Sequence, residues 1–160
     1  MAGGDVILPA MRFLTGWIAL LLAVSVTLAH AVDGKIIKVL PHFLDLQGRH
    51  SLSPSLFERD AYQAHLRKAP AEISSVRFDV EWSAPGTAAS PRLRIELRGK
   101  KAGAKPEVVE SPVKAGWFGG TWSVVKLDKE VYQQLGGIAA WRITLLDGES
   151  KLAEQKSFLW

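Results

Sequence analysis

The sequence predicts a mainly β domain, an antiparallel two-layer β-sandwich with one helix inserted between its first two strands. Apolar and polar side chains alternate over the short segments 76–82 and 92–98, which is the period of a strand with one buried face. Segments rich in glycine, proline and serine separate these runs, as expected for the turns of a sandwich. The chain contains no cysteine, so such a fold would be held by its core rather than by disulfides.

The beginning of the chain has the pattern of an export signal. Residues 13–29 are apolar and uncharged, and Arg12 precedes them. Ala29 and Ala31 flank a single residue, which is the small-x-small site that signal peptidase cleaves. We therefore expect a hydrophobic signal helix within a signal peptide at 1–31.

Cleavage after Ala31 would leave a single domain at 32–160, in the periplasm or outside the cell. Met11 is the expected initiator, because a start there gives a compact basic leader. The alternative is an uncleaved inner-membrane anchor over 13–29, since a bilayer is spanned by roughly 17 to 25 apolar residues. We expect no other contact with the membrane.

The first strand and the helix follow the signal segment. An apolar strand is expected at 34–40, ending at Pro41. Residues 54–69 predict the inserted helix, in which Ser55 and Glu58 have the spacing of a capping box.

This helix is expected to cover one end or one face of a sheet through Phe57, Ala61 and Leu66. Its charged residues would then face water. We assign it no catalysis.

The middle of the chain predicts three further strands or edges. In the first two, at 76–82 and 92–98, alternate residues are expected to point into the core. The third, at 106–113, is expected to be a weak edge strand because prolines bound it. The inward-facing side chains are expected to be Val76, Phe78, Val80, Trp82, Leu93, Ile95 and Leu97.

The next segment predicts a strand followed by a short helix. Residues 121–127 would place Trp122 and Val124 on the buried face. A helical turn is expected near 129–135, with Asp128 as its cap and Gly136 at its end.

The chain then predicts a hairpin. A strand from residue 138 would turn at Asp147-Gly148 into a last strand. The terminal aromatic residues of 158–160 are expected to pin this last strand into the sandwich.

Four tryptophans are expected to form the bulk of the core, since each indole buries about 150 to 250 Å². They are Trp82, Trp122, Trp141 and Trp160. The arrangement resembles the architecture of immunoglobulin-like and fibronectin type III-like domains, although the Cys…Trp…Cys spacing of true immunoglobulin domains is absent.

Several classes of function lack their sequence signals. The chain has no G-x-S-x-G nucleophile elbow, no glycine-rich phosphate loop and no cysteine nucleophile. Its net charge of +4 is too small to indicate nucleic-acid binding. We therefore expect a protein that is not an enzyme and that holds no cofactor.

Three histidines raise the question of a metal site. His42, His50 and His65 lie near one another in the sequence, but their spacing matches no metal-binding motif. We expect His65 to be exposed on the helix and the other two to lie in a loop, with no bound metal. A metal-dependent hydrolase is the remote alternative.

Two short segments are candidates for ligand binding. Trp117 and Phe118 lie between glycines, where they could present a stacking surface, unless they tuck against the sandwich. Lys100 and Lys101 lie in a basic loop that could contact an anionic polymer. The leading hypothesis is an interaction or accessory module of the cell envelope, whose partner is an unknown protein or envelope polymer. A domain that binds carbohydrate or another small ligand through these residues is the alternative.

Overall fold

The structure, a computed structural model, describes residues 34–116 and 120–160. The predicted signal helix and signal peptide at 1–31, the predicted cleavage residues Ala29 and Ala31, and the predicted start at Met11 lie outside these residues. In chain order the elements are β1 (Lys35–Asp45), α2 (Leu56–Lys68), a short 3₁₀ turn (Pro70–Glu72), β2 (Ile73–Ser83), β3 (Pro91–Gly99), β4 (Glu107–Pro112), β5 (Thr121–Lys126), α3 (Lys129–Leu135), β6 (Ile138–Asp147) and β7 (Ser150–Lys156).

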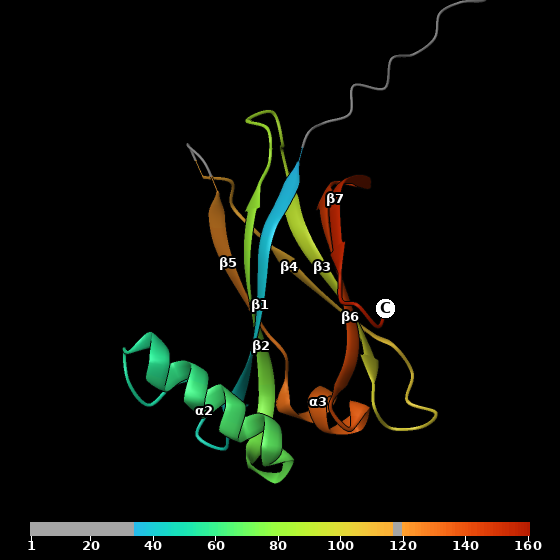
Figure 1. Ribbon diagram of the computed structural model, residues 1–160. Coiled ribbons are helices and arrows are strands. Elements are labelled where there is room, and N and C mark those ends of the chain that lie inside the picture. The colour runs from blue at the N-terminus through green and yellow to red at the C-terminus, as the bar shows by residue number, and fades with distance from the viewer. Residues whose placement is uncertain (1–33, 117–119) are drawn as a thin grey trace, which may run out of the picture. The chain divides into compact units, whose positions relative to one another are not determined.

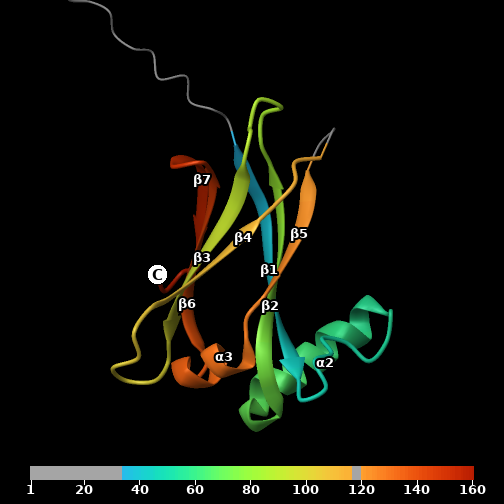
Figure 2. The ribbon, with the colours of Figure 1, turned by 180° about the vertical axis from the view of Figure 1, so that it is seen from behind.

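The strands form two antiparallel sheets, as the sequence predicted for a mainly β chain (Figure 1). One sheet has the order β1-β2-β5 and the other has the order β4-β3-β6-β7. Helix α2 connects β1 to β2, and α3 connects β5 to β6. Both helices lie at the end of the sheets where β1 finishes and β6 begins (Figures 1 and 2). No helix in the described ranges combines the length and apolar character needed to cross a bilayer.

The inner faces of the two sheets share one core. The predicted inward side chains of 76–82 and 92–98 are all buried, with exposed fractions of 2% or less. Contact between the sheets includes Phe78 of β2 and Trp141 of β6, whose rings meet edge to face with centroids 6.2 Å apart. The strand alternation in the sequence therefore identified this part of the core correctly.

The two helices predicted within the described residues, at 54–69 and near 129–135, are present. The Ser55 hydroxyl accepts a hydrogen bond from the Glu58 amide at 3.5 Å, as expected for a capping residue. Gly136 ends α3 with a left-handed φ of 64°. Asp128 stands at the predicted cap of α3, but its side chain makes no capping hydrogen bond.

The prediction that β1 ends at Pro41 is wrong, because the strand continues to Asp45. Pro41 pairs with Phe78 of β2, and β1 has no strand on its other side within its sheet. An edge strand tolerates proline because the missing N–H can be one that no neighbouring strand needs. The strand therefore carries Phe43 to the end of the sheet where the helices lie.

The placement of Trp122 and Val124 in the core is also wrong. They are 49% and 58% exposed, whereas Val125 is buried. Trp122 pairs with Glu81, which points away from the core, so the alternate residues of β5 face inward. The consecutive valines leave both registers open in the sequence, and the pairing with β2 selects between them.

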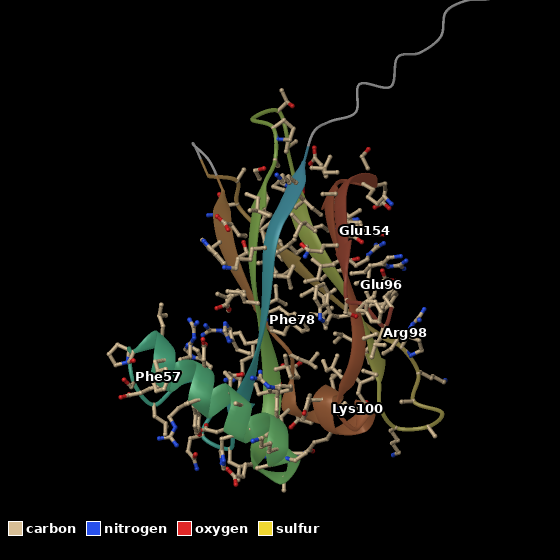
Figure 3. The ribbon with its side chains drawn as sticks, viewed as in Figure 1. Phe57, Phe78, Glu96, Arg98, Lys100 and Glu154 are labelled. Atoms are coloured by element: carbon tan, nitrogen blue, oxygen red, sulfur yellow. The ribbon has the colours of Figure 1, made fainter. Side chains whose placement is uncertain are left out.

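Helix α2 uses a different contact face from the predicted one. Leu66 is fully buried, as expected, but Phe57 is 83% exposed and Ala61 is exposed too. Phe57 lies near the end of the helix that projects away from the sheets (Figure 3). Contact with β1 is made instead by residues in the second half of the helix, including the buried Gln63.

The terminal residues do not pin the last strand. β7 ends at Lys156, and Phe158 is fully exposed. Trp160 lies outside the core, where the guanidinium carbons of Arg98 and Arg142 approach its ring centroid to 4.1 and 4.7 Å. Of the four predicted core tryptophans, Trp82 is fully buried and Trp141 packs partly buried against the core.

Candidate functional site

One edge of the domain is open over part of its length. β7 pairs with β6 only from Arg142 to Asp147, while β1 extends on to Asp45 (Figure 1). Toward the other end of the sheets the edge is closed, since a side chain at Gly34 would collide with Leu152 of β7. Within the described residues, Ile138–Ala140 of β6 have a strand partner only on the β3 side. This difference in strand length leaves access to the space between the sheets.

Two adjoining chambers occupy the open edge. The aromatic chamber, about 320 Å³, has Phe78, Trp141 and Pro41 among its walls. The donor chamber, about 410 Å³, is lined by residues that include Lys100 and Tyr132. Three residues line both chambers: Phe43, Arg67 and Ile138. The two chambers together form the cleft, which brings β1, α2, α3, β6 and the β3–β4 loop to one place.

The polar side chains among the residues that line the donor chamber, those of Arg67, Lys100 and Tyr132, all carry hydrogen-bond donors. Arg67 and Lys100 are exposed, and neither has an ion-pair partner within the described part of the chain. Burial raises the pKa of Tyr132, so its phenol keeps its proton at neutral pH. No aspartate or glutamate lines either chamber. The cleft therefore offers donors and positive charge next to an apolar wall.

Helix α2 positions Arg67 through the side chains that precede it. The Gln63 amide accepts a hydrogen bond from the Phe43 N–H at 2.8 Å and donates to the carbonyls of Phe43 and His50 at 2.9 and 2.8 Å. These bonds satisfy the outer edge of β1 as a neighbouring strand would. Leu66 inserts into the core beside this contact, and Arg67 follows it at the mouth of the cleft.

The loop between β1 and α2 is fixed by a buried carboxylate. Asp45 accepts hydrogen bonds from the backbone N–H groups of Gln47 and Arg49, from the Arg49 guanidinium and from the Tyr62 hydroxyl, all at 2.8 to 2.9 Å. Burial by itself would raise the pKa of Asp45, but these hydrogen bonds outweigh it and lower the pKa to about 2. The carboxylate thus holds α2 against the end of β1.

The β3–β4 loop positions Lys100 against the end of α3. The backbone N–H of Lys100 donates to the Gly137 carbonyl, and that of Lys101 donates to the Leu135 carbonyl, each at 3.0 Å. A side chain at Gly99 would collide with the Leu135 carbonyl, which explains the glycine there. Lys100 lies beside α3 (Figure 3), and its aliphatic carbons pass over Gly137.

The structure divides the predicted binding residues. Lys100 lines the cleft, whereas Lys101 is exposed and is not among the lining residues. Trp117 and Phe118 lie outside the described residues, so a binding role for them stays a prediction. Arg67 and Tyr132 were missed, because nothing in their local sequence distinguishes them from ordinary helix residues. Only the tertiary contacts bring them to Lys100.

The prediction that His42 lies in a loop is wrong, because His42 is buried in strand β1. Its Nε2 lies 3.6 Å from Oδ2 of Asp79, and the same oxygen accepts a hydrogen bond from Arg77 at 2.7 Å. The His50 ring centroid is 5.5 Å away, and burial lowers the pKa of both histidines. His65 is exposed as predicted and contacts Glu72.

These groups form a half-buried charged cluster on the outer face of the three-stranded sheet. In the described residues, no three histidine, cysteine, aspartate or glutamate side chains gather in a way that could hold a metal ion. The Arg77 guanidinium pairs with Oδ2 of Asp79, whereas Oδ1 of this carboxylate is buried without a partner among the described residues. The cleft, with its unpaired donors, is the better candidate for a functional site.

Comparison of the chain with known proteins gave no match. No family model, curated protein or solved structure matches it.

Proposed function

We propose that the protein is an exported, non-enzymatic binding module of the cell envelope that takes a small, largely apolar ligand into the cleft. The observation that carries this proposal is the pair of adjoining chambers at the open edge, of about 320 and 410 Å³. Binding pockets for small molecules are commonly about 300 to 1,000 Å³, mostly apolar, with a few convergent polar groups. The cleft fits this description.

The side chains of the cleft favour binding over catalysis. Among the described residues, no aspartate, glutamate or histidine lines either chamber, and burial raises the pKa of Tyr132, which keeps its phenol neutral. General acid–base catalysis needs a group that exchanges a proton near the working pH. We therefore propose a ligand-binding role without turnover.

The architecture is part of the proposal. Seven strands in sheets of three and four, with a core between the sheets, support an immunoglobulin-like or fibronectin type III-like sandwich. In this proposal the cleft is an elaboration of the sandwich edge, formed because β7 stops at Lys156 and α2 extends past the end of β1.

Ligand binding is tested by protein-observed NMR with a neutral apolar probe, 4-phenylbutanamide. The expected result is saturable binding, with shifts concentrated at Phe43, Gly137 and Ile138. Ala139→Trp, which would fill the aromatic chamber, should abolish it, and Ala102→Trp at the exposed loop tip should not. Shifts scattered over the surface, or equal binding by both variants, would contradict the proposed site.

Export is tested separately. When the full chain is produced in a bacterium, the mature protein recovered from the envelope fraction should begin at Val32, as read by N-terminal sequencing. A chain that keeps residues 13–29 and fractionates with the inner membrane would favour the anchored alternative.

A further inference from the structure

The charges of the cleft have one sign. Arg67 comes from α2 and Lys100 from the β3–β4 loop, so two segments far apart in the sequence bring cations to one chamber. The charged pairs found elsewhere in the described residues show that this chain usually matches its surface arginines with carboxylates, as Arg142 is matched by Glu96 at 2.6 Å. No aspartate or glutamate is among the described residues that line the donor chamber.

A third donor completes the set. The Tyr132 side chain lines the same chamber and is largely buried, and no hydrogen bond of its hydroxyl to another described residue is found. The hydroxyl is not among the side-chain atoms that are buried without a partner, so it is open to the chamber, where it can donate to a ligand atom in place of water. All three side chains can thus donate to a ligand acceptor, and the two cations favour an anionic one.

The apolar wall lies next to these donors. Phe43 and Ile138 line both chambers, and Phe78 and Trp141 continue the wall into the aromatic chamber. A ligand that filled both chambers would therefore place an apolar body against the aromatic rings and a polar head against the donors.

We infer that the ligand of the cleft is an amphipathic organic carboxylate, such as a fatty acid or an arylalkanoate, whose carboxylate is bound by Arg67, Lys100 and Tyr132. This inference rests on the proposed function and adds to it the chemical class of the ligand. A guanidinium fork matches the two oxygens of a carboxylate, while an ammonium and a phenol supply further donors. The aromatic chamber takes the hydrocarbon or aryl part.

A matched pair of probes tests the head group. 4-Phenylbutyrate and 4-phenylbutanamide have nearly the same shape, but only the first is an anion at pH 7. Isothermal titration of the full chain at low salt should give a Kd for the acid at least about tenfold lower than for the amide, because hydrogen bonds to charged groups are the stronger ones. The difference should shrink as salt is added.

Substitutions of Arg67 and Lys100 test whether these two residues cause the preference for the acid over the amide. Arg67→Gln and Lys100→Gln should each remove most of the preference for the acid, because each should weaken binding of the acid by a much larger factor than binding of the amide. The matched controls are Arg59→Gln, on the same helix, and Lys105→Gln, in the same loop, neither of which lines the cleft. Both controls should keep the full preference. Tyr132→Phe should weaken acid binding by a smaller factor, and thermal unfolding of each variant checks that it folds.

The outcomes separate the two proposals. Equal binding of acid and amide, or equal loss of preference in the control variants, overturns the carboxylate assignment and leaves the cleft as a site for neutral ligands. Tighter binding of phenyl phosphate than of any carboxylate tried also overturns the assignment. Failure of both probes, with fatty acids of six to ten carbons also failing, overturns the proposed function and this inference with it.

Discussion

Asp45 is the residue on which the geometry of the cleft most depends, although it does not line it. Its carboxylate joins the loop 45–49 to the Tyr62 hydroxyl, and it is only 3% exposed. A buried carboxylate is stable when hydrogen bonds replace the water that it has lost, and here two backbone amides, a guanidinium and a phenol do so.

The first prediction concerns the pH dependence of stability. The pKa of Asp45 falls from an ordinary value of 3.8 to about 2 in the folded chain, so the folded state favours the ionised form. This contribution is fully present above pH 3.8 and is lost as the pH falls through 2. In urea denaturation between pH 5 and pH 2, the free energy of unfolding should therefore fall less steeply for Asp45→Asn than for the wild type.

At pH 7 the same variant should be destabilised by about 1 to 3 kcal/mol, because the amide cannot replace every hydrogen bond of the carboxylate. Asp60→Asn is the control, since Asp60 is exposed on α2. It should change stability by less than about 0.5 kcal/mol. A parallel pH profile for Asp45→Asn and the wild type would contradict the assigned role.

At the scale of elements, α2 is held by one short face. Leu66 is fully buried and Gln63 bonds to β1, whereas the first turns of the helix are largely exposed. Among the described residues, Leu52, Leu56 and Phe57 are large apolar side chains left in water near that end. The helix is therefore attached through its second half, next to Arg67.

The second prediction compares two apolar residues of this helix. Leu66→Ala should destabilise the domain by about 2 to 5 kcal/mol, since it opens a cavity in the core. Phe57→Ala should change stability by less than about 0.5 kcal/mol, because its ring is already in water. Chemical denaturation measures both. Similar losses for the two variants would mean that the first half of α2 packs on the sheets after all.

The elements differ in how far their sequences determine them. In segments 76–82 and 92–98, apolar and polar side chains alternate without interruption. Only the two-residue period of a strand fits this pattern, so their buried faces were predicted correctly. In 121–127 the pair Val124-Val125 breaks the alternation, and the face is chosen by pairing with Glu81 and its neighbours on β2. The continuation of β1 past Pro41 was missed because proline ends a central strand but not an edge strand, and position in a sheet is not visible locally.

At the scale of the whole molecule, the cleft depends on lengths and crossings that no local pattern encodes. It forms because β1 is longer than β7 at one edge, and because helix α2 brings Arg67 and the β3–β4 loop brings Lys100 to the gap. Lys100 could be predicted as a binding residue because it lies in a basic loop. Arg67 and Tyr132, which line the same chamber, belong to helices whose sequences look like those of ordinary solvent-exposed helices. The lack of catalytic motifs can be read from the sequence, and the compartment is predicted from it, whereas the convergence of side chains in the cleft requires the fold.

The core, in contrast, is continuous across both sheets. Val80 of β2 and Leu93 of β3 are each fully buried in the same cluster, and Phe78 and Trp141 meet across it. Neither sheet has a second apolar layer of comparable burial among the described residues, so neither should be stable without the other.

The third prediction is that the sheets unfold together. Val80→Ala and Leu93→Ala remove methyl groups from opposite walls of the core and should each cost about 2 kcal/mol or more. In a cooperative domain, either variant lowers the free energy of amide hydrogen exchange by the same amount in β2 and in β6, as measured by NMR for the slowest amides of each strand. A loss confined to the sheet that carries the substitution would show two independently stable layers. In that case the cleft between them could open without global unfolding, and its walls would not hold Arg67 and Lys100 in a fixed relation.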